Sequence, residues 1–171
     1  VKSSSFHTNN THLKEAVLCY GKAKIVGYVE KVDIHIHASW VDVWKVMTPY
    51  ANNIGTELND DNLNSFIAAP NSICTETYIL IGADLNLDKN QCEHICMYLK
   101  TKFARFMLSL AKTSQHATAK TYRFVPMQDF TSKSDINWNK SIPEIDKQLY
   151  AKYGLSDDEI TFIEEKIKPM E

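Results

Sequence analysis

Asp33, His35 and His37 occupy alternate positions in the segment 32–38, whose remaining residues are apolar. On a β-strand, alternate side chains point to the same face, so one carboxylate and two imidazoles would lie together there. This set of donor atoms suits zinc or iron. A polar strand face exposed to solvent explains the pattern equally well, and no further cluster of metal ligands is evident in the sequence.

A second candidate for chemistry is Glu164-Glu165-Lys166, which contains the E-x-K fragment of a common nuclease signature. That signature needs its acid and lysine beside an aspartate on a strand, whereas this segment is predicted to be helical. The chain has no G-x-S-x-G elbow, and its five glycines are too scattered for a phosphate-binding loop. A triad of distant residues stays open, but the sequence gives no positive indication of catalysis.

The most informative feature is the distribution of charge. Between Glu93 and Asp129 the chain has no acidic residue, although the whole sequence has 19 Lys+Arg and 21 Asp+Glu. The window 94–128 holds these basic residues: Lys100, Lys102, Arg105, Lys112, Lys120 and Arg123. A basic strip on an otherwise acidic chain is typical of a surface that binds a polyanion. The alternative is an ordinary solvated helix face.

Length and composition indicate one globular domain covering residues 1–171, with 44% hydrophobic and 23% charged residues. No apolar run approaches the roughly 18–20 residues needed to cross a bilayer. The first residues contain neither an initiator methionine nor a signal peptide, so we expect a fragment of a longer protein. The four cysteines form no C-x2-C pair and are predicted to be buried free thiols in a reducing cytoplasm.

The first half of the chain is predicted to form short strands. Alternating or β-branched apolar residues indicate strands at 23–29, 32–38, 66–69 and 75–81. The segment 43–50 fits either a strand or a helical turn, and 51–64 is predicted to be a polar loop.

The clearest predicted element is a single helix at about 89–113. Asp88 and Gln91 form a capping box at its start. If Leu99 lies at the centre of the buried stripe, the opposite face gathers five polar or basic residues: Thr101, Lys102, Arg105, Ser109 and Lys112. We expect this face to be exposed and basic, because no acidic residue is available for i,i+4 pairing.

A short strand at 121–125 and two short C-terminal helices complete the predicted structure. Ser141 with Glu144, and Ser156 with Glu159, have the spacing of capping boxes. Gly154 stands where a glycine ends the first of these helices. The predicted fold class is therefore α+β, with a mixed or mostly antiparallel sheet, one long amphipathic helix and two short C-terminal helices.

Several stretches resemble a C-terminal pattern of adenine-specific DNA methyltransferases from restriction–modification systems, the group similar to the EcoRI methylase and fused restriction-methylase enzymes. They are Tyr98-Leu-Lys-Thr-Lys-Phe-Ala-Arg-Phe-Met-Leu-Ser-Leu-Ala-Lys, Ser114-Gln-His-Ala and Tyr122-Arg-Phe-Val-Pro-Met-Gln-Asp-Phe. The similarity continues through Trp138, 146–155 and 163–170, and upstream through 44–46 and 74–78. It covers roughly residues 40–171.

The resemblance implies a target recognition domain, which reads the DNA sequence for a methylase. The N-P-P-[YF] motif and the glycine-rich cofactor loop of such enzymes do not occur in this chain. They would belong to the parent's methyltransferase domain, which binds S-adenosylmethionine, extrudes the adenine and methylates it. We expect no cofactor in this chain itself and a bacterial cytoplasmic location; a fused endonuclease in the parent stays open.

The predicted function is sequence-specific recognition of double-stranded DNA. Phosphate contacts are expected from Lys100, Lys102, Arg105 and Lys112. Contacts near the bases are expected from Thr101, Gln115, His116, Lys120 and Arg123, and the resemblance adds Lys45 and Thr75. With four to six phosphate contacts, log K should fall with log salt at a slope of about −4 to −5. The alternative is a protein-interaction module, whose basic strip docks an acidic partner or the parent's catalytic domain.

Overall fold

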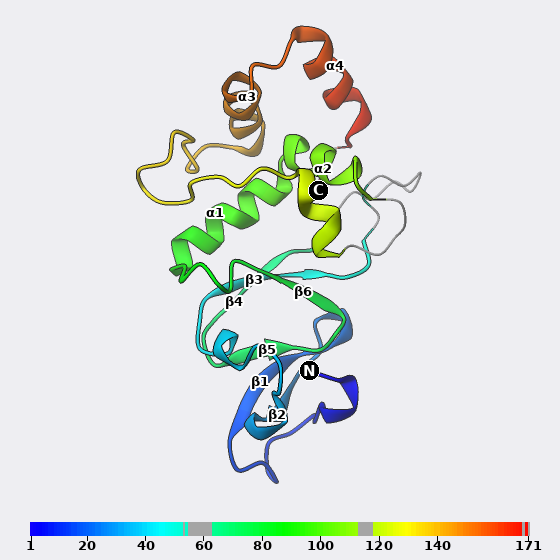
Figure 1. The fold of residues 1–171 in the computed structure, drawn as a ribbon, viewed down its shortest axis with the longest axis vertical. Helices are drawn as coiled ribbons and strands as arrows, with labels where there is room; N and C mark the ends of the chain where they lie inside the picture. Colours follow the sequence, from blue (N-terminus) through cyan, green and yellow to red (C-terminus); the bar gives the residue numbers. More distant parts are fainter. Residues whose placement is uncertain (53, 55–62, 113–117, 169, 171) are drawn as a thin grey trace. The chain divides into compact units, whose positions relative to one another are not determined.

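The computed structural model describes residues 1–52, 54, 63–112, 118–168 and 170. Helices and short strands combine in an α+β fold, which confirms the predicted fold class (Figure 1). The chain forms two compact units, which we call unit 1 (Val1–Tyr50 and Phe66–Cys92) and unit 2 (Ala51–Ser65 and Glu93–Glu171). Neither unit is one continuous stretch, and the single domain expected from the sequence stays a prediction.

Unit 1 contains a mixed three-stranded sheet in the order β2-β1-β5, with bounds Val26–Glu30, Ala16–Tyr20 and Ser72–Cys74. β1 runs antiparallel to β2, with Val17 opposite Val29, and parallel to β5, with Cys19 opposite Ile73. Its core consists of buried apolar residues: Val17, Cys19, Val29, Ile34, Val41 and Ile73. This burial is what stabilises strands of only three to five residues.

The second sheet of unit 1 has the order β4-β3-β6, with bounds Phe66–Ala68, Lys45–Pro49 and Tyr78–Ile81, and all its neighbours are antiparallel. The predicted strands at 66–69 and 75–81 are thus confirmed, the second in its C-terminal half. The ambiguous segment 43–50 forms the central strand β3, which is buried along most of its length.

The strand predicted at 32–38 is wrong. The segment begins in the 3-10 turn η3 (Lys31–Asp33) and ends in the 3-10 turn η4 (Ala38–Trp40), residues 34–37 between them are irregular, and His37 has a φ of 57°. Of the alternating apolar residues Ile34 is buried, whereas Val32 and Ile36 are 73% and 75% exposed. The alternation therefore buries no strand face, and without that burial a two-residue period does not specify a strand.

The N-terminal segment, with η1 (Ser3–Ser5), lies against β2 through close backbone contact. His7 and Tyr28 exchange two backbone hydrogen bonds of 2.8 Å. A Cβ atom at Gly27 would overlap the carbonyl oxygen of His7 and the ring of Phe6. β2 itself begins after the turn η2 (Lys22–Lys24), so the strand predicted at 23–29 starts three residues later.

The helices follow β6, with bounds Lys89–Lys100 (α1), Lys102–Ser109 (α2), Ala119–Phe124 (the 3-10 helix η5), Ile142–Lys152 (α3) and Asp157–Lys166 (α4). The single long helix predicted at about 89–113 is wrong, because the chain forms α1 and α2 with a break at Thr101. The strand predicted at 121–125 is also wrong, since those residues belong largely to η5.

The capping residues predicted at the helix starts and the glycine predicted after α3 are confirmed. Asp88 and Gln91 exchange reciprocal backbone-to-side-chain hydrogen bonds of 2.8 Å at the start of α1. Ser156 and Glu159 form the equivalent pair of hydrogen bonds at the start of α4, of 2.8 and 3.3 Å, and the Glu144 carboxylate accepts from the Ser141 amide at the start of α3. Gly154 follows α3 with a φ of 63°, a left-handed conformation that favours glycine.

Unit 2 has an aromatic core beside α1. Tyr98, Phe130 and Trp138 are buried, with ring centroids 5.3–6.0 Å apart. The Tyr98 hydroxyl donates to the carbonyl oxygen of Pro126, which fixes the segment after η5 against this helix.

The four cysteines are free thiols, as predicted. Cys19, Cys74 and Cys92 are buried and Cys96 is partly buried. Burial raises the pKa of Cys19 and of Cys96 to about 11, so these thiols stay protonated at neutral pH. None of the helices in the described part of the chain has the length and apolar character needed to cross a bilayer.

Candidate nucleic-acid interface

The break at Thr101 changes which side chains the acid-free window presents. The Thr101 hydroxyl donates to the carbonyl oxygen of Tyr98 at 2.6 Å and accepts from the Ala104 amide at 3.1 Å. It therefore terminates α1 and caps α2, and its side chain is fully buried. A projection of 89–113 as one continuous helix consequently assigns the wrong exposed face.

Arg105 is the largest departure from the expected exposed face, because only 2% of it is exposed. Its Nε donates to the carbonyl oxygens of Lys100 and Thr101 at 3.2 and 3.3 Å, and one terminal nitrogen donates to Lys168 O at 2.7 Å. The guanidinium thus satisfies carbonyl groups at the helix break and ties the segment after α4 to it. The prediction that Arg105 contacts a phosphate is therefore wrong, because its side chain is buried.

Lys102 and Lys112 also bond within unit 2. The Lys102 amino group forms a 2.6 Å ion pair with Glu164, which also accepts from the Tyr150 hydroxyl at 2.9 Å. The Lys112 amino group donates to the carbonyl oxygens of Asn52 and Ile54 at 2.7 and 2.8 Å. Both lysines are partly buried, so neither is presented to solvent as the predicted basic face required.

Asp146 is a buried carboxylate close to Lys102 and Arg105. Its role was not predicted from the sequence. Its two carboxylate oxygens accept from the backbone amides of Lys102 and Phe103, at 3.0 and 2.9 Å, at the start of α2. Burial raises the pKa of Asp146 to about 6, because lost hydration outweighs the two amide donors and the Arg105 guanidinium. No local pattern predicts this contact, since the partners lie 43 and 44 positions away.

Lys45 and Thr75, which the resemblance added, are both buried in unit 1. The Lys45 amino group donates to the carbonyl oxygens of Val41 and Val43 at 3.1 and 2.8 Å. Burial lowers the pKa of Lys45 to about 8. The Thr75 hydroxyl shares a 2.8 Å hydrogen bond with that of Thr77. A direct contact of either side chain with DNA does not fit this burial.

Three of the predicted cations are exposed: Lys100, Lys120 and Arg123. Lys100 is the last residue of α1, and the other two lie on η5. The Arg123 guanidinium lies over the ring of Phe124, 4.7 Å from its centroid. The start of η5 is fixed by the buried Thr121, whose hydroxyl bonds both the amide and the carbonyl oxygen of Thr118. Gln115 and His116, predicted near the bases, lie outside the described residues.

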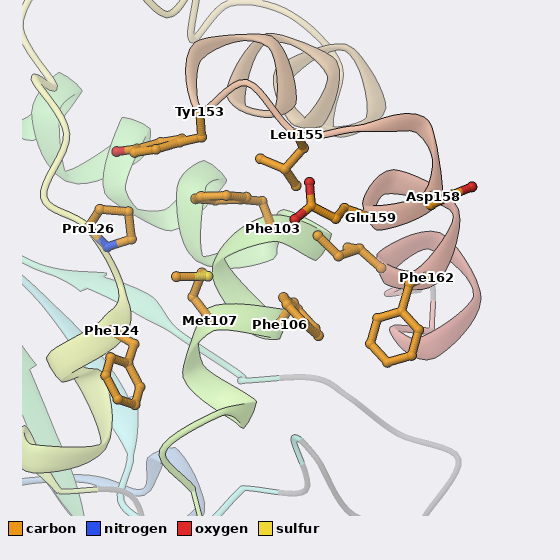
Figure 2. A pocket seen from close by; sticks show the side chains of 11 residues that line it. Phe103, Phe106, Met107, Phe124, Pro126, Tyr153, Leu155, Asp158, Glu159 and Phe162 are labelled. Carbon is orange, nitrogen blue, oxygen red and sulfur yellow. The ribbon is translucent and has the colours of Figure 1, made fainter.

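An open groove lies between α2, the end of η5 and the α3–α4 turn (Figure 2). Its volume is about 550 Å³. Phe103 stacks on Tyr153 on one side, and Phe106 meets the edge of Phe162 on the other. No pattern in the sequence predicts that the turn after α3 faces Phe103 and Phe106.

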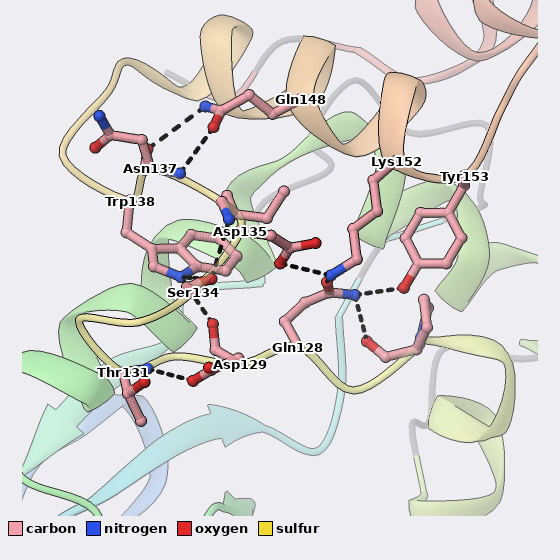
Figure 3. Close-up of polar contacts among 12 residues, drawn as sticks. Gln128, Asp129, Thr131, Ser134, Asp135, Asn137, Trp138, Gln148, Lys152 and Tyr153 are labelled. Carbon is pink, nitrogen blue, oxygen red and sulfur yellow. Dashed lines mark hydrogen bonds and ion pairs between the residues drawn. The ribbon is translucent and has the colours of Figure 1, made fainter.

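Gln128 holds one wall of this groove in place (Figure 3). Its amide nitrogen donates to the Tyr153 hydroxyl at 2.8 Å and to Pro126 O at 3.1 Å, while its oxygen accepts from Lys152 at 2.9 Å. Lys152 also pairs with Asp135 at 2.8 Å. The segment after η5 is therefore bonded to the end of α3 through one buried amide.

The predicted ligand set does not lie on one strand face: Asp33 ends η3, His37 directly precedes η4, and His35 lies between the two turns. Among the residues that the structure describes, His, Cys, Asp and Glu do not gather in threes around a metal-sized space. The His37 ring instead stacks on Trp40, at 3.6 Å between centroids, and the Trp40 indole donates to Asp84.

Comparisons of this chain with protein-family models, curated proteins and solved structures found no match.

Proposed function

We propose that this chain recognises double-stranded DNA in a sequence-specific manner, as part of an adenine-specific DNA methyltransferase or a bifunctional restriction–modification enzyme. The resemblance of residues 40–171 to the target recognition domains of that group supports the proposal. The structural observation that carries it is the exposure of Lys100, Lys120 and Arg123 in a window without acidic residues.

The chemistry of these side chains fits a phosphate backbone. A lysine ammonium neutralises a phosphate as a point charge, and an arginine guanidinium can bind phosphate or a guanine edge with two parallel hydrogen bonds. Stacking on Phe124 restricts the Arg123 side chain, which lowers the entropy lost when it binds. Methyl transfer, with its S-adenosylmethionine, belongs in this proposal to the parent's methyltransferase domain.

Charge reversal on η5 tests DNA binding directly. The variant Lys120→Glu with Arg123→Glu should weaken binding to a duplex by about 100-fold at low salt, since two phosphate contacts become repulsive. Lys133→Glu is the matched control, because Lys133 is an exposed lysine outside the acid-free window. Equal affinities of the double variant and the wild type would contradict the proposed interface.

Sequence specificity requires a separate measurement. Repeated selection from duplexes with about twelve randomised base pairs should enrich one motif that contains an adenine. A bound pool that stays random through the selection would contradict sequence-specific recognition by this chain.

The alternative is that the same exposed cations dock an acidic protein surface or the parent's catalytic domain. Reversal of Arg105 and Lys112 cannot separate the two functions, because both side chains bond internally and their loss would disturb the fold. The Lys120→Glu, Arg123→Glu variant can, when it is made in the full parent protein. Lost DNA binding with intact assembly supports recognition, and lost assembly supports docking.

A further inference from the structure

The groove of unit 2 combines an aromatic interior with acidic residues in its lining. Phe103, Phe106, Met107, Phe124, Tyr153 and Phe162 form most of its surface (Figure 2). Among the described residues that line it, the charged ones are Asp158 and Glu159. The first turn of α4 adds Asp157 beside them.

The carboxylate of Glu159 is fixed in position. It accepts from the Ser156 amide at 2.8 Å, and these contacts lower the pKa of Glu159. Figure 2 shows this side chain directed toward Phe103 and Phe106, whereas Asp158 points away from the groove. The groove therefore holds a permanent negative charge beside the faces and edges of aromatic rings.

This charge disfavours a nucleic-acid occupant, because the Glu159 carboxylate would repel a phosphate in the groove. An apolar body that carries a positive charge fits both features, since aromatic faces attract cations at close range.

The exposure of the walls indicates the size of the occupant. Phe162, Phe124 and Tyr153 remain 56%, 43% and 41% exposed. A small ligand is normally enclosed over most of its surface, whereas these rings present apolar area beyond the hollow itself. Amphipathic helices that lie in open apolar grooves cover such walls with successive anchor side chains.

We propose that the groove binds an amphipathic polypeptide segment of a partner, which inserts large apolar side chains and places lysine or arginine beside Glu159. The stacking of Phe103 on Tyr153 and the edge contact of Phe106 with Phe162 keep the anchor positions formed before the partner arrives.

The test uses the chain of residues 1–171 and two helical peptides of about 18 residues, one of leucine and lysine and one of leucine and glutamate. The lysine peptide should bind in a fluorescence-anisotropy titration, and the glutamate peptide should bind at least about tenfold more weakly. Equal binding of the two peptides would overturn the charge argument.

Variants locate the binding in the groove. Phe162→Ala should weaken binding of the lysine peptide by about tenfold or more, since it removes an anchor wall. Leu85→Ala is the matched control, because Leu85 is a half-exposed apolar residue of unit 1 that does not line the groove. Unchanged binding by Phe162→Ala would overturn the site.

Glu159→Gln isolates the charge without removing the helix cap, since glutamine also serves at the third position of a capping box. It should weaken the lysine peptide about threefold to tenfold at low salt, and this loss should disappear at high salt. A salt-independent affinity in both proteins would count against the proposal.

A small organic cation tests whether the groove prefers a small ligand to a peptide. Benzyltrimethylammonium should bind much more weakly than the lysine peptide, because it contacts only the hollow. If it binds more tightly than the peptide, the groove is a small-cation site and the proposal fails. Lys120→Glu alone keeps the contact between Arg123 and Phe124, so it should leave peptide binding intact while it weakens DNA binding. This result is therefore separate from that of the proposed DNA interface.

Discussion

Lys45 is a fully buried lysine whose amino group is bonded to backbone carbonyl oxygens. The pKa lowered to about 8 means that the folded protein gives up this proton more readily than an unfolded chain does. A side chain that supplies charge to an interface keeps its ordinary pKa and its hydration. Lys45 has neither, so its role in the structure is to satisfy carbonyl groups beside β3.

The pH dependence of stability tests this role. Between about pH 8 and pH 10.5 the unfolded chain holds the Lys45 proton and the folded protein does not, so the unfolding free energy rises with pH. The wild type should gain about 2–3 kcal/mol relative to Lys45→Met across this window. Urea unfolding at several pH values measures the difference, which also cancels the opposite effect of the cysteines. A constant difference would contradict the buried, depressed lysine.

At Gly27 the constraint is steric, because the neighbouring chain leaves no room for a side chain. Because a Cβ atom would overlap His7 and Phe6, Gly27→Ala should detach the N-terminal segment from β2 and cost about 1–3 kcal/mol. Hydrogen exchange at the Tyr28 amide, which donates to His7, should become faster.

Gly154→Ala is the comparison for Gly27→Ala, since Gly154 has open space around it and needs only its positive φ. It should cost about 1–2 kcal/mol and leave exchange at Tyr28 unchanged. Equal exchange rates in both variants would contradict the steric explanation at Gly27.

At the scale of elements, α2 depends on groups outside its own sequence. A helix of eight residues has few internal hydrogen bonds, and its first amides need acceptors. Thr101 supplies one acceptor locally, while Asp146 of α3 supplies two from far along the chain. The start of α2 and the position of α3 are therefore coupled.

Asp146→Asn should destabilise the protein by about 1–3 kcal/mol, because the amide offers one acceptor where the carboxylate offers two and leaves a buried N–H unpaired. Asp157→Asn, at an exposed aspartate, should change the unfolding free energy by less than about 0.5 kcal/mol. The measurement is denaturant unfolding at neutral pH, and equal midpoints of the two variants would contradict the cap.

At the scale of the whole molecule, the structure leaves fewer exposed cations than the sequence predicted, which changes the expected salt dependence of DNA binding. With Lys100, Lys120 and Arg123 as the phosphate contacts, log K should fall with log salt at a slope of about −3, shallower than the −4 to −5 expected from the sequence. Titrations between about 50 and 200 mM salt measure this slope. A value near zero would contradict DNA binding, and one near −5 would mean that further cations take part.

How far the sequence predicted this molecule depended on the range of the interactions. Capping boxes such as Asp88 with Gln91 were predicted correctly because both partners lie within one helical turn. Arg105 was misplaced because its burial depends on a break four residues earlier and on a carbonyl 63 positions away. The strand at 32–38 failed for the same reason, since alternation specifies a face only when another element covers it.

The path of the chain between Tyr50 and Phe66 has a practical consequence. The antiparallel strands β3 and β4 belong to unit 1, yet the residues that join them belong to unit 2, where Asn52 and Ile54 bind Lys112. No single truncation point therefore separates the units. A chain cut at residue 92 would leave the second half without its inserted segment, so isolating either unit requires splicing two separate stretches of the gene.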